Sequence, residues 1–238
     1  MGTKRTPPRK NRIRHHVEVE AAILAAAEQR LAEDGAAGLG LRTIARDVGM
    51  SPSAIYRYFD GIDALLTALI VRAYRDQTAA ARRGLDTLAV PADSSGVTLA
   101  VEEIVAVLAA ARRWAVSNPH RYALIYGSPV PGYTAPADTV APASGVGDLI
   151  MGSLSRIVRP SGPRLELADL TEDTIGFWAQ AYGLISFELF GHFVGTGIDP
   201  EVLFLRSVRQ GAIRVLAGYG CEVAITGIHM ENPASDCL

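Results

Sequence analysis

The chain of 238 residues is 49% hydrophobic and carries a net charge of −2, so we expect one or two domains with a sizeable core. No run of about 18 apolar residues occurs and no apolar segment follows the basic N-terminus, which excludes a helical membrane span and a secretory signal. The two cysteines, Cys221 and Cys237, are too few for a disulfide framework or metal site, so we expect a cytoplasmic protein without metal or cofactor.

Residues 1–16 are predicted to form a basic, flexible arm. Six basic side chains precede the first acidic residue, Glu18, and they are Lys4, Arg5, Arg9, Lys10, Arg12 and Arg14. Such an arm can follow the phosphate backbone of DNA or enter its minor groove, and Arg12 and Arg14 are the candidate contacts. A disordered, solubilising tail explains the same composition equally well.

The next segments predict three helices. Apolar residues recur at three- and four-residue spacing from Val17 to Asp34, and Gly35 is suited to end that helix. The stretch from Leu41 to Phe59, LRTIARDVGMSPSAIYRYF, then predicts two short helices joined by a tight turn. Within it, Ser51 is the expected cap of the second short helix and Pro52 its first residue.

Three residues of this stretch have the steric properties that a helix-turn-helix (HTH) requires. Ala45 is small enough for the second helix to cross the first, and Gly49 can supply the positive φ of the turn. Ile55 is expected to anchor the second helix in the core. The outer face of residues 52–58 is then free to enter a DNA major groove.

The rest of the chain predicts further helices, so the fold class is all-α with about nine helices and no convincing strand. Helices are expected over Ile62–Leu88, Val97–Ser117, Pro119–Tyr126, Gly145–Val158 and Pro200–Ala217, with Asn118 as the cap of the third. A further helix is expected to begin at a capping box formed by Asp169 and Glu172 and to end at Phe193. A loop is expected over Gly127–Pro142. The predicted domains are the arm 1–16, an HTH domain 17–61, a helical ligand-binding and dimerisation domain 62–217 and a loose tail 218–238.

The first 65 or so residues resemble the DNA-binding domain of the tetracycline-repressor (TetR) family. The matching pieces are ILAAAEQRLAEDG, LRTIARDVGMS, the SPSAIYRYF recognition helix and DALL. More weakly, WAVSNPHRYALIYGSPVPGY and WAQAYGLISFELFGHF resemble one subgroup of the family's ligand-binding domains. The resemblance implies a homodimer on a palindromic DNA operator, with half-sites about 34–36 Å or a multiple apart, and release by a small molecule.

Two positions depart from the family pattern. Gly40 stands where a Ser or Thr usually caps the second helix, and Gly is a tolerable cap. Ile62 stands where the family usually has a Lys that contacts phosphate. Because this Lys is absent, we expect the phosphate contacts to come from the basic arm or from Tyr56 and Tyr58.

The candidate DNA contacts follow from the resemblance and from position on the helices. They are Arg42, Thr43, Ser51, Pro52, Ser53, Ala54, Tyr56, Arg57 and Tyr58, beside Arg12 and Arg14 of the arm. Arg57 suits a bidentate contact with guanine O6 and N7, and a phosphate contact is about equally expected. The tyrosines can donate to phosphates, although the ring of Tyr56 has a packing alternative, whereas Phe59 is expected in the core.

The C-terminal half predicts an apolar pocket without catalytic chemistry. The candidate ligand-binding residues are Trp114, Tyr122, Tyr126, Phe177, Trp178 and Tyr182, and they suit a small apolar or amphipathic effector. Each one alone is more often a core residue. His120 and His192 are interpreted as structural or pocket-lining.

Dimerisation is expected to use the last two long helices. In the first of them, Gly176, Ala179 and Gly183 recur at three- and four-residue spacing, and this spacing permits a close approach of a second helix. This helix also carries the large apolar residues Trp178, Phe187 and Phe190, which are too many for one solvent-exposed helix face. A four-helix interface between two copies of the chain would bury them.

A ligand-responsive regulator, expected to be a repressor, is the leading interpretation. The sequence contains no Gly-x-Ser-x-Gly elbow, phosphate loop, dinucleotide fingerprint or HExxH motif, so no catalytic residue and no enzyme activity is expected. An enzyme acting on an apolar molecule, and a partner-binding protein with a vestigial HTH, are the alternatives.

Overall fold

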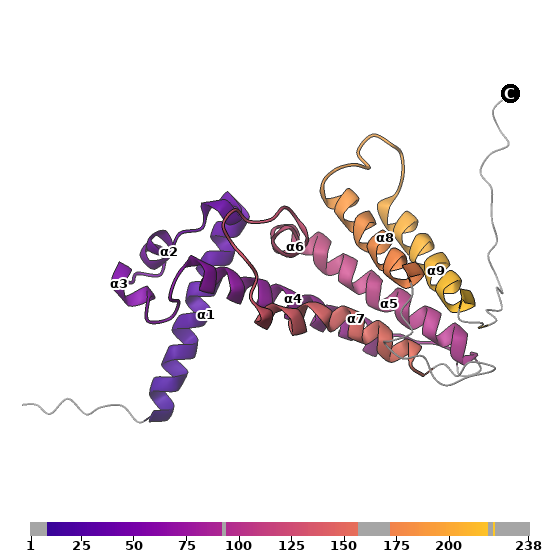
Figure 1. The fold of residues 1–238 in the computed structure, drawn as a ribbon, viewed down its shortest axis with the longest axis horizontal. Helices are drawn as coiled ribbons and strands as arrows, with labels where there is room; N and C mark the ends of the chain where they lie inside the picture. The colour runs from indigo at the N-terminus through magenta and orange to yellow at the C-terminus, as the bar shows by residue number, and fades with distance from the viewer. Residues whose placement is uncertain (1–8, 92–93, 157–171, 219–220, 222–238) are drawn as a thin grey trace, which may run out of the picture.

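The computed structural model describes residues 9–91, 94–156, 172–218 and 221, and its regular elements there are all helical (Figure 1). They are α1 (Arg9–Asp34), η1 (Ala36–Gly38), α2 (Leu41–Asp47), α3 (Pro52–Ile55), α4 (Ile62–Asp86), α5 (Gly96–Ser117), α6 (Pro119–Tyr126), η2 (Ala137–Thr139), α7 (Val140–Leu154), α8 (Glu172–Leu189) and α9 (Pro200–Gly218). The predicted all-α class with about nine α-helices is confirmed over this part of the chain. None of the helices described is both long and apolar enough to cross a membrane.

The N-terminal core joins α1, α2 and α3 to the first turns of α4. Its buried side chains are Ile23, Ala27, Leu41, Ile44, Ala45, Ile55, Phe59, Leu65 and Leu69. Ala45 and Ile55 are both fully buried, as their positions in the HTH predict. Because α4 contributes Leu65 and Leu69 here and Ala73 and Ala81 to the second core, this long helix belongs to both halves of the molecule.

The turn between α2 and α3 is closed by the backbone conformation predicted for Gly49. Its φ is +69°, the left-handed region that favours glycine. The amide of Met50 donates to the Ala45 carbonyl at 2.7 Å, and that of Gly49 to Arg46 at 3.1 Å. These two bonds satisfy the last carbonyls of α2 and direct the chain across it into α3.

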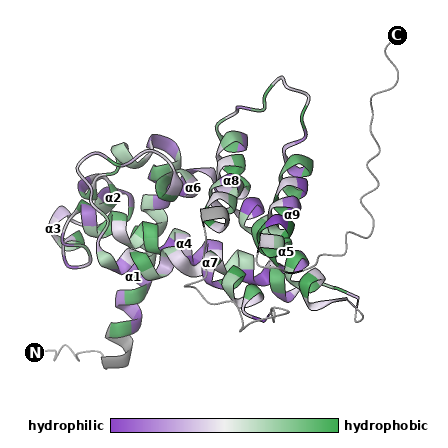
Figure 2. Cartoon of the chain, turned by 45° about the vertical axis from the view of Figure 1, so that its right-hand side comes forward, coloured by the Kyte–Doolittle hydropathy of each residue, from purple (hydrophilic) through white to green (hydrophobic). Residues whose placement is uncertain are grey.

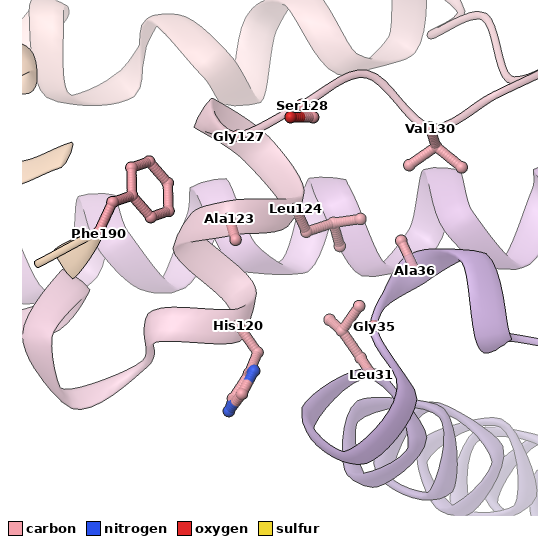
Figure 3. A pocket seen from close by; sticks show the side chains of 10 residues that line it. All are labelled: Leu31, Gly35, Ala36, His120, Ala123, Leu124, Gly127, Ser128, Val130 and Phe190. Atoms are coloured by element: carbon pink, nitrogen blue, oxygen red, sulfur yellow. The ribbon is translucent and has the colours of Figure 1, made fainter.

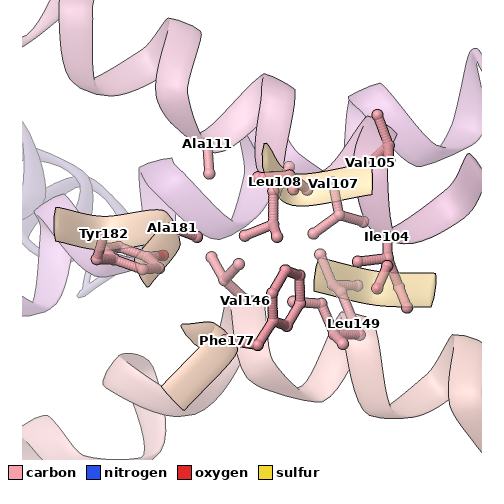
Figure 4. Close-up of a cluster of buried hydrophobic side chains, with 14 of the residues drawn as sticks. Ile104, Val105, Val107, Leu108, Ala111, Val146, Leu149, Phe177, Ala181 and Tyr182 are labelled. Atoms are coloured by element: carbon pink, nitrogen blue, oxygen red, sulfur yellow. The ribbon is translucent and has the colours of Figure 1, made fainter. Parts of the chain in front are cut away.

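The C-terminal core lies among α4, α5, α7, α8 and α9. In Figure 4 the Phe177 ring of α8 lies among Leu108 of α5 and Val146 and Leu149 of α7. α8 and α9 lie side by side at the end of the molecule opposite the HTH (Figure 1). This packing buries one side of α8, while Ile175 and Phe187 of this helix and Phe190 just after it stay exposed among the described residues.

Four helix boundaries differ clearly from the prediction, and one of them is the end of α7, at Leu154 rather than Val158. α1 begins at Arg9 rather than Val17, so the second half of the predicted arm is helical. α7 begins at Val140 rather than Gly145, because Pro142 lies in its first turn, where a missing amide proton leaves no bond unmade. α8 ends at Leu189 rather than Phe193, because Gly191 adopts a φ of +80° and the next amide donates back to Phe187.

Two predicted side-chain caps are also wrong. Ser51 makes no capping bond, and its hydroxyl lies 3.2 Å from that of Ser53. Asn118 does not cap α6 through its side chain, and instead its amide donates to the Trp114 carbonyl at 2.8 Å, where it closes the end of α5. By contrast, Asp199 caps α9, since its carboxylate accepts from the amides of Glu201 and Val202.

Two further expectations fall partly outside the described residues. Asp169 of the predicted capping box lies there, and so does most of the predicted loose tail, including Cys237. Within the tail, Cys221 is buried in the C-terminal core, and its amide donates to the Leu216 carbonyl at 3.1 Å. This residue therefore packs as part of the domain.

The close crossing of α4 and α5 depends on Gly84. A Cβ at this position would lie 2.6 Å from Cβ of Ala110 and 2.9 Å from the Ala106 carbonyl oxygen. Gly84→Ala is therefore expected to lower the free energy of unfolding by about 1–3 kcal/mol, measured by urea denaturation at a fixed protein concentration.

The matched control is Gly152→Ala in α7, where a Cβ would meet no atom within 4 Å. This variant is expected to be more stable than the parent by about 0.5–1 kcal/mol, because alanine loses less backbone entropy in a helix. Equal effects of the two substitutions would contradict the proposed steric role of Gly84.

Candidate functional site

The predicted DNA-contacting face of the HTH lies on the surface of the molecule. Arg42, Ser51, Pro52, Ser53 and Arg57 are exposed, and Thr43 and Ala54 are half-buried. Neither of the two arginines forms an ion pair with another described residue, so both charges remain available to a polyanion. The buried side chains Ile44 and Ile55 fix the two helices that carry these groups.

The two tyrosines of this face have different surroundings. Tyr56 is 47% exposed, so its ring is not a core residue. Tyr58 is half-buried, and its ring stacks on His16 of α1 with the centroids 4.6 Å apart. No periodic pattern predicted this contact, because His16 lies outside the apolar repeat that indicated the first helix.

The basic arm is partly an extension of α1. Arg14 is exposed on this helix and lies 3.3 Å from the Glu18 carboxylate, one turn later. Arg12 also lies within α1. The extended helix therefore fixes where these two backbone positions lie relative to the HTH.

An ion pair fixes α1 against α2. The guanidinium of Arg30 donates to both carboxylate oxygens of Asp47, at 2.8 and 3.0 Å. These hydrogen bonds lower the pKa of Asp47 below its ordinary value. Because the pair is solvent-exposed, it contributes little to the stability of the fold, and its main effect is to orient α2 against α1.

The two departures from the family pattern have clear structural roles. Gly40 lies at the N-cap of α2 in an extended conformation, and its carbonyl accepts from the Ile44 amide at 3.0 Å. Ile62, the first residue of α4, is partly buried against the N-terminal core. At this position the chain therefore has a packing contact in place of a cation.

Four of the six aromatic candidates form a continuous series of ring contacts inside the C-terminal half. Tyr122 contacts Tyr126, Tyr126 contacts Tyr182, and Tyr182 stacks on Trp178, with centroids 4.6–5.0 Å apart. A residue that we did not predict, Tyr74 of α4, meets the edge of Tyr126 at 5.9 Å.

The other two aromatic candidates belong to the same core but are outside this series of ring contacts. Phe177 is buried in the C-terminal core. Trp114 lies under the guanidinium of Arg121, 5.6 Å from its ring centroid, beside a separate cavity. All six aromatic residues therefore belong to the C-terminal core or pack against it, whereas the ring contacts described join only four of them.

Two cavities bear on function. One, of about 300 Å³, separates Leu31 and Gly35 at the end of α1 from His120 of α6 (Figure 3). The other, of about 480 Å³, lies between α7 and α8 and is lined mainly by apolar side chains, with Trp178 and Phe177 on its α8 side. In the described part of the chain, no three side chains of His, Cys, Asp or Glu gather in a way that could hold a metal ion.

Helix α6 contacts both halves of the molecule. On one side Tyr122 is fully buried in the C-terminal core. On the other side Leu124 packs against the N-terminal core, and Arg121 lies 3.5 Å from Glu28 of α1 and 2.5 Å from Asp76 of α4. This short helix therefore connects the C-terminal core with α1 and α4.

Comparison with known proteins agrees with this architecture. Residues 23–69 match the family model described as bacterial regulatory proteins, tetR family, and residues 104–210 match a tetracyclin repressor-like C-terminal domain. The HTH-type transcriptional regulator Rv1816 of Mycobacterium tuberculosis is 36% identical over 215 residues, which cover 79% of this chain and 88% of that protein. Mb1846 of Mycobacterium bovis is similar to the same extent.

Solved structures give the same result. The putative regulatory protein SCO4313 superposes with a TM-score of 0.69 at 31% identity, over 86% of this chain and 98% of that one. A Rhodococcus protein of unknown function superposes with a TM-score of 0.63 at 23% identity, over 91% of this chain and all of that one, and shares the fold.

Proposed function

The chain belongs to the TetR family of DNA-binding transcriptional regulators, and from that premise we propose that it is a ligand-responsive repressor. As a homodimer it binds a palindromic operator, and a small molecule in the C-terminal half releases it. The observation that supports this most directly is the exposed pair Arg42 and Arg57, which stands on an HTH whose turn and core have the required geometry.

DNA recognition requires both positioning and base contacts. Arg42 opens α2, and Tyr56 and Arg57 follow α3, so all three lie on the surface that the two helices share. Phosphate contacts from Arg42 and Tyr56 would fix the register of the domain on the duplex, and Arg57 would read a base in the major groove. Because Ile62 supplies no charge, Arg12 and Arg14 on the extended α1 would add phosphate contacts.

A gel shift with the DNA upstream of the protein's own gene tests this function. A saturable shift that weakens steeply as salt rises is expected, because phosphate contacts release counterions. If the full-length protein gives no shift with this fragment or with a randomised DNA library at low salt, the HTH is vestigial and the proposal fails.

Arg57→Ala is expected to relax sequence preference at one position of each half-site. Loss of a bidentate guanine contact costs about 1–3 kcal/mol of discrimination, so selection from a randomised library should yield mixed bases there. Arg14→Ala is the matched control, and it should weaken all sequences alike and flatten the salt dependence. An unchanged base preference in Arg57→Ala would reduce this residue to a phosphate contact.

Dimerisation is supported by the outer faces of α8 and α9. Six large apolar side chains are exposed over α8, its connection to α9 and the start of α9: Ile175, Phe187, Phe190, Val194, Ile198 and Val202. Figure 2 shows hydrophobic residues along both helices. A Cβ added at Gly176 or Gly183 would meet no atom within 4 Å, so α8 leaves room for a second helix. Two copies of this face would form the predicted four-helix interface.

The release of DNA would proceed through α6. An effector that displaces Tyr126 or Tyr182 also moves the helix that carries Arg121 and Leu124. These two residues contact α1 and the N-terminal core, so the HTH would turn relative to its partner and the spacing of the two recognition helices would no longer match the operator.

A further inference from the structure

Gln77 of α4 is an unusual residue for the interior of a helical domain. Its side chain is fully buried, and its amide oxygen accepts a hydrogen bond from the Tyr126 hydroxyl at 3.0 Å. Its Nε2, which carries two N–H donors, has no hydrogen-bond acceptor. A buried donor without an acceptor is expensive, so it calls for a group that the chain itself does not supply.

A second unused donor lies beside the first. Tyr182 is 7% exposed, and its hydroxyl forms no hydrogen bond of good geometry, although the Tyr126 hydroxyl lies nearby. Its ring contacts that of Tyr126, the same residue that binds Gln77, so the two unpaired donors flank one ring. Tyr122 offers a direct contrast, because its equally buried hydroxyl interacts with the Tyr182 carbonyl at 3.0 Å and with Ser186 at 2.8 Å.

The charges around this cluster disfavour an anionic ligand. Burial raises the pKa of Tyr126 and Tyr182 above the ordinary value, so both phenols keep their protons. The contacts described for Gln77 and for the Tyr74, Tyr122, Tyr126 and Tyr182 rings include no charged side chain. A buried carboxylate here would lack a counterion, which costs far more than burial of a neutral acceptor.

The cavity between α7 and α8 reaches this cluster through Trp178. This residue lines the cavity, and its indole stacks on the Tyr182 ring with the centroids 4.7 Å apart and the planes at 26°. The other lining groups are mainly apolar, among them Ile150, Met151 and Ile175. Asp148 is the one charged residue among those that line the cavity, and it is an anion. An apolar ligand chain therefore fits this space, whereas a carboxylate is disfavoured here as well.

We infer that the effector is an uncharged, mainly apolar molecule with a carbonyl-type hydrogen-bond acceptor at one end. Its apolar part occupies the α7–α8 cavity, and its acceptor takes the unused donors of Gln77 and Tyr182 when Trp178 turns aside. This inference rests on the proposed ligand response, and it adds the chemical class of the ligand and two polar contacts. The same ligand would press on Tyr126, and thereby on α6.

The test uses the full-length protein and four probes of similar length: methyl decanoate, decanoate, decylammonium and undecane. The chain has only two tryptophans, so Trp114→Phe leaves Trp178 as the single fluorescent reporter at the proposed entrance. Fluorescence titration without DNA is expected to show that methyl decanoate binds at least about tenfold more tightly than each of the other probes. A difference of this size corresponds to one or two hydrogen bonds between ligand and protein.

Three variants in the Trp114→Phe background separate ligand recognition from structure. Tyr182→Phe and Gln77→Leu are each expected to weaken methyl decanoate binding about fivefold to tenfold while undecane binding stays unchanged. Tyr182→Phe should hardly lower the thermal midpoint of the ligand-free protein, because it removes a donor that has no acceptor. Gln77→Leu should lower the midpoint, because it also removes the acceptor of the buried Tyr126 hydroxyl. Tyr122→Phe is the matched control, and it should lower the midpoint while the preference for ester over alkane persists.

Several outcomes would overturn the inference. Decanoate or decylammonium binding as tightly as the ester would mean that charge is recognised, and undecane binding as tightly would mean that no polar contact forms. A large loss of stability in Tyr182→Phe, with unchanged ester preference in both Tyr182→Phe and Gln77→Leu, would assign the two donors to a buried water. No fluorescence change with any probe up to its solubility limit would exclude this ligand class.

Failure of the inference and failure of the proposed function are distinguishable. If methyl decanoate binds but leaves the gel shift unaltered, the site is correct and the proposed release by this ligand is wrong. If another class of molecule releases the DNA and the ester does not bind, the regulator is correct and the assigned chemistry is wrong.

Discussion

Phe187→Glu is expected to convert the dimer into monomers at micromolar concentration and to weaken operator binding by about a hundredfold or more. Phe187 is 52% exposed, on a face of α8 that no other described helix covers. A glutamate buried in an apolar interface would lack a counterion, and the isologous contact would place it there from both copies. Because a dimer gains affinity from the second half-site at high effective concentration, monomers should bind the operator far more weakly.

Sedimentation velocity and gel shifts on the same samples measure this effect. Val116→Glu is the matched control, since Val116 of α5 is also exposed, at 43%, and lies outside the α8–α9 face. This variant should remain dimeric and bind the operator normally. A monomeric parent protein at micromolar concentration, or a Phe187→Glu variant that dimerises undiminished, would contradict the proposed interface.

Arg112→Ala is expected to cost about 3–5 kcal/mol of stability, the range for removing one partner of a buried ion pair. The guanidinium donates to both oxygens of Glu188 at 2.6 and 2.7 Å and lies 3.2 Å from Glu201, so it ties α5 to α8 and α9. Although burial disfavours the charge, the hydrogen bonds with Glu188 and Glu201 raise the pKa of Arg112 above its ordinary value. Its removal leaves Glu188, which is only 16% exposed, without its cation.

A double variant identifies the cause of this loss. Arg112→Met combined with Glu188→Leu removes both buried charges and should recover most of the stability, because apolar residues of similar volume replace buried pairs at little cost. Urea denaturation at matched protein concentrations provides the measurement. A loss below about 1 kcal/mol in Arg112→Ala would show that the pair acts as a surface salt bridge.

The N-terminal half could be predicted from sequence in considerable detail. Gly49 adopts the positive φ expected of it, Gly35 follows the end of α1 as predicted, and Ala45 and Ile55 are buried as the HTH spacing predicts. These signals are local, because a turn or a packing position within about 20 residues depends on neighbours that the sequence itself places in register. The caps were less predictable, since Asn118 had two helix ends within reach and closes the earlier one.

The C-terminal half was predicted as a set of helices but not as a site. The aromatic residues were identified by type, yet only the packed structure separates Trp114 from the series that links Tyr122, Tyr126, Tyr182 and Trp178. Gln77 gave no signal at all, because a single polar residue on an apolar helix face does not disturb its periodicity.

The sequence by itself determined the HTH, its turn and the exposed residues that we propose as DNA contacts, because each follows from conformational preference and short-range spacing. The tertiary structure alone decided which distant groups meet: Arg112 with Glu188, 76 residues later, and Arg121 with Glu28 and Asp76. It also decided that the donors of Gln77 and Tyr182 are buried without acceptors. Such pairings depend on the angles at which helices cross, and those angles are set by the summed packing of many side chains rather than by any local pattern.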